Sequence, residues 1–127
     1  ALADELHYLD ASVGLEHTGH WQAAHNSYRA AVERWPHSLT AWMGLGNSAY
    51  AVGNLAAAAQ AYRKALLIDE HYAPAYNNLA QTLADRKQWA EAEYMAQRAV
   101  DIGGNHMADY QQTLQDILQR KNAADQK

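Results

Sequence analysis

The 127-residue sequence contains no cysteine and no phenylalanine, only two prolines, and fewer basic than acidic residues. Without cysteine the chain can form no disulfide and offers no cysteine zinc ligand or cysteine nucleophile. Lys and Arg number 10 against 14 Asp and Glu, which gives a net charge of −4. Because binding to a phosphate backbone needs clustered basic charge, this balance argues against a nucleic-acid-binding protein.

No apolar run approaches the roughly 18 to 20 residues of a membrane-spanning helix, so no membrane span is predicted. The chain begins with Ala1 rather than Met, and no basic segment followed by an apolar one comes after it. We therefore expect a processed chain or an excised fragment, from which any targeting signal would have been removed. Alanine is abundant and proline is scarce, and this composition favours helix nearly everywhere.

An interval of 34 residues recurs through the whole sequence and organises it as a repeat. Large aromatic residues mark this interval; they are Tyr8, Trp42, Tyr76 and Tyr110. Two series of alanines keep the same interval; they are Ala24, Ala58 and Ala92, and Ala31, Ala65 and Ala99. Small residues at fixed positions let antiparallel helices approach closely, so each repeat is predicted to contain a pair of packed helices.

A turn divides each repeat into two helical segments. In the middle copy Gly53 and Asn54 interrupt the apolar pattern, since Gly suits the left-handed residue after a helix and Asn caps the next helix. The first copy has Gly19 at the same turn, but the third copy has Lys87. A left-handed turn at this lysine would cost about 1 kcal/mol or force another geometry.

The middle copy resembles a tetratricopeptide repeat. The residues that carry the resemblance, at their mutual spacings, are Trp42, Leu45, Gly46, Ala58, Tyr62 and Ala65. The resemblance implies an all-α fold with one domain over residues 1–121, in which three helical hairpins and a capping helix form a right-handed superhelical solenoid. The expected repeats are 5–38, 39–72 and 73–106, followed by the capping helix at 107–121 and a frayed tail at 122–127.

The family fold implies a concave groove lined by the first helix of each hairpin. The expected peptide-binding residues of this groove are Thr40, Met43, Asn47, Asn77, Asn78, Gln81, Gln111 and Gln115. Most of them are carboxamides, which both donate and accept hydrogen bonds and so suit the backbone of an extended peptide. The alternative is that these amides are only the solvated surface of the helices.

Members of the family that clamp a C-terminal carboxylate hold the peptide backbone with asparagines and the terminal charges with basic residues. Asn47 and Asn78 match the two clamp asparagines, whereas Met43, Ala108 and Gln112 occupy the basic positions. We therefore predict that the ligand is an internal or charge-neutral peptide segment rather than a free acidic C-terminus.

An apolar stripe on the first predicted helix forms the second candidate site. Its residues, at intervals of three to four, are Leu2, Leu6, Leu9 and Val13. An uncovered stripe at the start of a repeat array needs a partner, and we expect it to dock on residues or a domain upstream. The alternatives are a hydrophobic anchor for a peptide, a homo-oligomer interface, and a core role for part of the stripe.

No catalytic, metal or cofactor site is predicted. The serines lack a nucleophile-elbow context, no glycine-rich phosphate loop is present, and the acidic residues are dispersed. His17, His20 and His25 lie near Glu16, but Gly19 should end the helix between them, so the regular spacing of helical metal ligands is lost. Solvated turn histidines are expected instead.

The leading interpretation is a non-catalytic protein-interaction module that binds an extended peptide or partner segment in its groove. Residues 28–104 are also similar to repeat tails that follow C39-like cysteine peptidase domains in bacterial envelope proteins. The alternative is therefore the C-terminal tail of a larger enzyme, which docks on its upstream domain or self-associates through its N-terminal helix. The compartment stays open between the bacterial cytoplasm and the periplasm or cell envelope.

Overall fold

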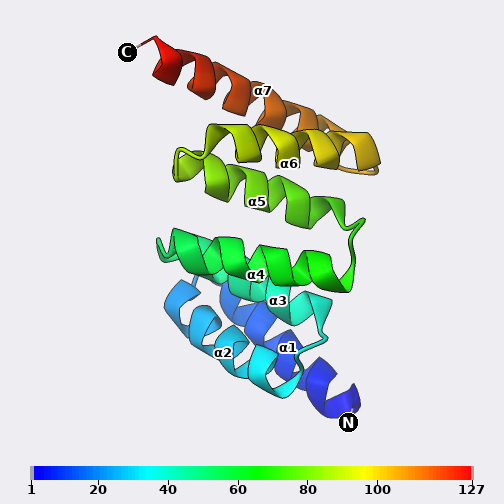
Figure 1. Ribbon diagram of the computed structural model, residues 1–127. Coiled ribbons are helices and arrows are strands. Elements are labelled where there is room, and N and C mark those ends of the chain that lie inside the picture. The colour runs from blue at the N-terminus through cyan, green and yellow to red at the C-terminus, as the bar shows by residue number, and fades with distance from the viewer. Residues whose placement is uncertain (1, 127) are drawn as a thin grey trace. The chain divides into compact units, whose positions relative to one another are not determined.

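The computed structural model describes residues 2–126, and within them it contains seven α-helices and no strand (Figure 1). In chain order these are α1 (Leu2–His17), α2 (Trp21–Arg34), α3 (Leu39–Ala51), α4 (Leu55–Ile68), α5 (Ala73–Asp85), α6 (Trp89–Ile102) and α7 (Met107–Asp125). The first six helices pair into three hairpins of similar length. The predicted all-α class and the helical-hairpin repeat are confirmed.

The helices form two compact units, one ending at Glu70 and the other beginning at His71. In the first unit α3 packs against α1, α2 and α4. In the second unit α5 and α6 form a hairpin, and α7 packs against both of them. Each unit therefore builds its own layer of helix-on-helix packing.

The recurring alanines are fully buried where the helices of the hairpins pack together. All six alanines of the two recurring series have no exposed surface. Two glycines of α3 also allow close packing, in each case against a tyrosine ring. A Cβ on Gly44 would lie 2.1 Å from the ring of Tyr28. A Cβ on Gly46 would lie 2.4 Å from the ring of Tyr62. Since real Cβ atoms do not approach other atoms so closely, these two positions require glycine while the tyrosines stay in place.

The helix ends follow the local sequence. The Oδ1 atom of Asn54 accepts a hydrogen bond from the Ala57 amide at 3.2 Å, as the predicted cap of α4 should. Gly53 before it has a φ of 87°. Lys87 occupies the equivalent turn with a φ of 62°, so this turn keeps the left-handed geometry despite the side chain.

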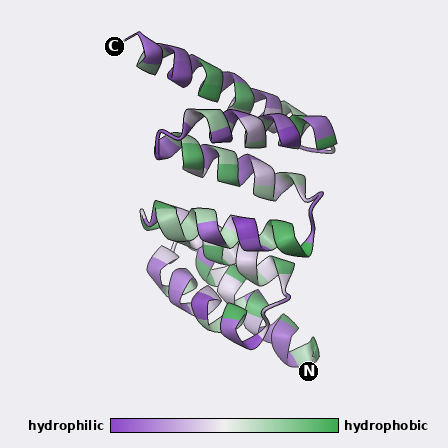
Figure 2. Ribbon diagram, viewed as in Figure 1, coloured by the Kyte–Doolittle hydropathy of each residue, from purple (hydrophilic) through white to green (hydrophobic). Residues whose placement is uncertain are grey.

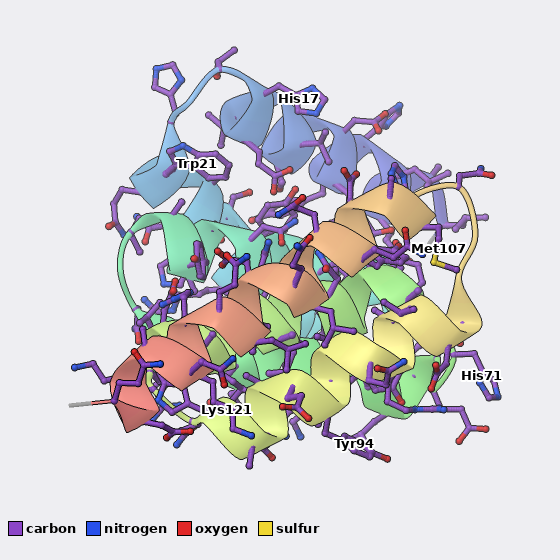
Figure 3. All side chains as sticks on the ribbon, turned by 90° about the horizontal axis from the view of Figure 1, so that it is seen from above. His17, Trp21, His71, Tyr94, Met107 and Lys121 are labelled. Carbon is purple, nitrogen blue, oxygen red and sulfur yellow. The ribbon has the colours of Figure 1, made fainter. Side chains whose placement is uncertain are left out.

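The last helix is longer than the sequence predicts. It continues to Asp125, past the predicted end at Lys121, so residues 122–125 of the predicted frayed tail are helical. Residue 127 of that tail lies outside the described residues. Two alanines in this segment favour helix. The Nζ atom of Lys121, which is labelled in Figure 3, donates to Glu93 Oε1 on α6 at 3.3 Å. The contact with α6 anchors the turn from which the extra residues continue.

Hydrophobic and hydrophilic residues are interspersed along the helices (Figure 2). No helix in the described part of the chain is both long enough and apolar enough to cross a bilayer.

Candidate functional site

The predicted groove residues of the first unit lie on α3 and differ in exposure. Thr40 is exposed, Met43 is buried, and Asn47 is half-buried. The hydroxyl of Tyr62 on α4 donates to Asn47 Oδ1 at 2.6 Å. This bond holds the Asn47 carboxamide in place and occupies its side-chain oxygen. Asn47 therefore has a structural role within the hairpin.

The predicted groove residues of the second unit form a row of carboxamides on α5. The Nδ2 group of Asn77 donates to Asn78 Oδ1 at 3.3 Å, which links the two side chains. One turn later the Nε2 group of Gln81 donates to Thr113 Oγ1 on α7 at 3.4 Å. The row therefore continues from α5 onto α7.

The remaining two predicted groove residues lie on α7. Gln111 and Gln115 are exposed and lie four residues apart, so they share one side of the helix. Thr113 is buried between them in sequence and receives the bond from Gln81. We call the set Asn77, Asn78, Gln81, Gln111 and Gln115 the carboxamide face of the second unit.

One atom of this face lacks a hydrogen-bond partner. Asn77 is only 9% exposed, and its Oδ1 atom accepts no hydrogen bond from any described residue. An unsatisfied buried acceptor costs about 1 to 3 kcal/mol relative to a satisfied one.

The apolar stripe of α1 is divided between surface and core. Leu2 and Leu6 are 69% and 53% exposed, whereas Leu9 is 5% exposed and packs in the core of the first unit with Val13 beside it. Leu9 and Val13 therefore have the core role that was the alternative for part of the stripe, and Leu2 and Leu6 are its exposed part. Leu9 belongs to the core cluster that contains Tyr28 and its neighbours in α2, and Val13 packs against this cluster.

The histidines do not all behave as the sequence predicts. His25 is 8% exposed, and its Nδ1 atom lies 3.5 Å from the buried Ser48 Oγ, so it is not a solvated turn residue. The sequence signal for this burial is that His25 stands one repeat before the buried Ala59. No group of three or more His, Asp or Glu in the described residues is arranged to hold a metal ion.

Burial shifts the titration of several groups in the first unit. It raises the pKa of Glu16 against the opposing effect of His17, and the Glu16 Oε1 atom has no donor among the described residues. Burial, and then the negative charge of Glu16, raises the pKa of Tyr28 to about 12. Burial, and then the charge of Arg29, lowers the pKa of His25, which favours the neutral imidazole.

Comparison with known proteins assigns the repeat to a family. A tetratricopeptide repeat model matches residues 15–73, and a second tetratricopeptide repeat model matches residues 74–104. Together the two matches cover well over half of the chain. The chain belongs to the tetratricopeptide repeat family.

One curated relative is the probable UDP-N-acetylglucosamine–peptide N-acetylglucosaminyltransferase SPINDLY of Hordeum vulgare. It is 36% identical to this tetratricopeptide repeat protein over 86 residues, which are 68% of this chain and 8% of the relative. The chain thus spans less than a tenth of the length of that enzyme.

Solved structures share the fold at low sequence identity. The Yersinia enterocolitica type III secretion chaperone SycD in complex with a peptide of the translocator YopD is 19% identical, with a TM-score of 0.83 and coverage of 91% of this chain and 92% of that one. The first tetratricopeptide repeat domain of Spaghetti (RPAP3), bound to the HSP90 peptide SRMEEVD, is 16% identical with a TM-score of 0.84. It matches over 91% of this chain and 90% of that one.

Proposed function

We propose that the chain is a non-catalytic protein-interaction module whose carboxamide face binds the backbone of an extended segment of a partner protein. The observation that carries this proposal is the set of exposed carboxamides Gln81, Gln111 and Gln115, together with the linked pair Asn77 and Asn78. A peptide N–H is the donor that an extended partner segment would supply. The family membership supports the proposal, since two structurally similar proteins are solved with bound peptides.

The charges around this face favour a ligand without a terminal carboxylate. None of its five residues is basic, and the nearby Arg120 guanidinium is already paired with Asp85 at 3.0 Å. The free acidic C-terminus of a peptide would therefore find no uncommitted cation among these residues. We propose an internal or charge-neutral segment as the ligand of the carboxamide face.

A second candidate is that these repeats act as one region of a larger protein. The match to a short part of the SPINDLY transferase favours this reading, because there the similar repeats belong to a much longer chain. The exposed Leu2 and Leu6 would then dock on an upstream domain or on a second copy. The C39-like peptidase tail remains one form of this candidate.

Peptide selection tests the first proposal. A display library of random twelve-residue peptides would be panned on the chain and counter-selected on the double variant Asn77→Ala, Asn78→Ala. Because each lost hydrogen bond is worth about 0.5 to 1.5 kcal/mol, the double variant should bind enriched peptides roughly tenfold more weakly. The control is Asn122→Ala, which removes an exposed carboxamide near the end of α7.

Two outcomes would contradict the proposal. One is that enriched peptides bind the double variant as tightly as the original chain. The other is that Asn122→Ala weakens them as much as the double substitution does. Circular dichroism of both variants would show whether the helical fold persists.

A further inference from the structure

A cleft of about 500 Å³ opens between α2 and α4 in the first unit. In Figure 1 these two helices lie in front of α1 and α3. The floor of the cleft comes from Trp42 and Leu45 on α3, while Arg29 on α2 and Lys64 on α4 contribute to its lining. We call it the α2–α4 cleft; it shares no residue with the carboxamide face.

A buried polar side chain lines this cleft. His25 is more than nine-tenths buried, and its Nδ1 atom lies 3.5 Å from Ser48 Oγ. The Ser48 hydroxyl donates a hydrogen bond to the carbonyl oxygen of Gly44 at 2.8 Å. The Nδ1–H of the neutral imidazole is therefore the donor towards Ser48, and the lone pair of Nε2 is left without a partner among the described residues.

The charges at the cleft are mostly basic. Arg29 and Lys64 stand against one carboxylate, Glu33, and neither cation forms an ion pair with a described residue. This local excess of positive charge occurs in a chain whose net charge is −4. A ligand that complements the cleft therefore carries negative charge.

An apolar hollow adjoins the cleft and shares two of its residues, Trp42 and Lys64. It also includes Leu67, which is 80% exposed, and Ile68, which is 38% exposed. Figure 2 shows the C-terminal turn of α4 as hydrophobic. The Trp42 indole is held in place because its Nε1–H donates to the carbonyl oxygen of Pro36 at 2.8 Å.

We propose that the α2–α4 cleft is a second protein-binding site, which takes a partner segment with an acidic side chain next to an apolar one. The carboxylate binds between Arg29 and Lys64, and the apolar side chain packs on Trp42 and Leu67. A backbone N–H of the segment donates to the Nε2 atom of His25. The segment would thus supply a counter-charge for the two cations, an apolar contact for the hydrophobic residues and a hydrogen-bond donor for the imidazole.

The same random twelve-residue display library provides the test, with a different counter-selection. The full chain is panned, and the double variant Arg29→Glu, Lys64→Glu is used to remove peptides that do not need the two cations. Binding of each enriched peptide to the ¹⁵N-labelled chain is then followed by nuclear magnetic resonance. The indole signal of Trp42 is assigned with the variant Trp42→Phe.

The proposal predicts that enriched peptides carry Asp or Glu beside Leu, Ile or an aromatic residue. Their addition should shift the Trp42 indole signal, and the charge-reversed variant should bind them at least tenfold more weakly. Leu67→Ser should also weaken them, whereas Arg86→Glu, the same charge reversal at an exposed site in the second unit, should not.

Three results would overturn the proposal: no peptide that depends on the two cations, enriched peptides without acidic residues, or a Trp42 signal that does not move. The double variant Asn77→Ala, Asn78→Ala separates this site from the carboxamide face. It should leave these peptides bound while it releases those selected on that face. Loss of either set of peptides alone therefore identifies which of the two sites fails.

Discussion

The hairpins α3–α4 and α5–α6 have different pairs of residues at the same two positions of the repeat. In the first, the ring of Tyr62 lies against Gly46, where no Cβ would fit. In the second, the positions one repeat later are Ala80 and Ala96, both buried. Both pairs are buried, but tyrosine plus glycine occupies more volume than two alanines, so each hairpin is packed around its own pair of residues.

The turns of the same two hairpins differ in a way that volume does not explain. Both turns have a left-handed residue, which is Gly53 in one and Lys87 in the other. Glycine adopts this conformation without a steric penalty, whereas a lysine Cβ meets the following carbonyl oxygen. The second hairpin therefore keeps a strained turn that the first avoids.

The largest expected effect comes from breaking the glycine–tyrosine contact. Gly46→Ala should lower the free energy of unfolding by about 2 to 3 kcal/mol, because the new Cβ would lie 2.4 Å from the Tyr62 ring. The reverse change in the other hairpin, Ala80→Gly, removes only one methyl group and adds backbone freedom, so it should cost about 1 kcal/mol. Urea denaturation measures both values.

A double variant sharpens this comparison. Gly46→Ala combined with Tyr62→Ala copies the Ala80 and Ala96 pair, so it should be no less stable than Tyr62→Ala alone. Fully additive losses would contradict a steric clash with the Tyr62 ring as the cause of the loss in Gly46→Ala. Gly14→Ala is the control, since nothing lies within 4 Å of a Cβ there, and it should raise stability by about 0.5 to 1 kcal/mol.

A smaller effect is expected at the turns. Lys87→Gly should raise the free energy of unfolding by about 1 kcal/mol, because it relieves the strain of a φ of 62°. Gly53→Lys should lower stability by a similar amount in the first hairpin. If Lys87→Gly destabilises the protein, interactions of the lysine side chain outweigh the strain. Thermal unfolding of the two variants decides between these results.

The smallest effect is expected at Glu16 and depends on pH. Burial raises the pKa of Glu16, so its contribution to stability is present below the ordinary pKa and is lost as the pH rises through the folded-state pKa. At pH 7 the variant Glu16→Gln should therefore be more stable than the original chain. The gain should vanish by about pH 3, where the carboxyl is protonated in both states. An equal gain at both pH values would indicate a cause other than ionisation.

The sequence was sufficient to predict the hairpins, because their signals are local and repeated. The buried alanines recur at one constant interval, and Gly53 with Asn54 marks a turn by its own backbone chemistry. The end of α7 was not predictable in this way, since its last turns continue from a contact between Lys121 and Glu93 on another helix.

The candidate sites were predictable only in part, because exposure depends on contacts between helices. Leu6 and Leu9 stand on the same apolar stripe, yet one is exposed and the other is buried against α2. Periodicity cannot distinguish these two outcomes. The α2–α4 cleft was missed for a similar reason, since Arg29 and Lys64 are far apart in sequence and are brought to one cleft by α3.

The most direct test of the peptide-binding account is the set of side-chain amide signals of the carboxamide face. With the ¹⁵N-labelled chain and a peptide selected on that face, the account predicts shifts of the NH₂ signals of Asn77, Asn78, Gln81, Gln111 and Gln115. The signal of Asn122 should stay in place. Binding that leaves all five unmoved would contradict the account, because the peptide would then be held by some other surface.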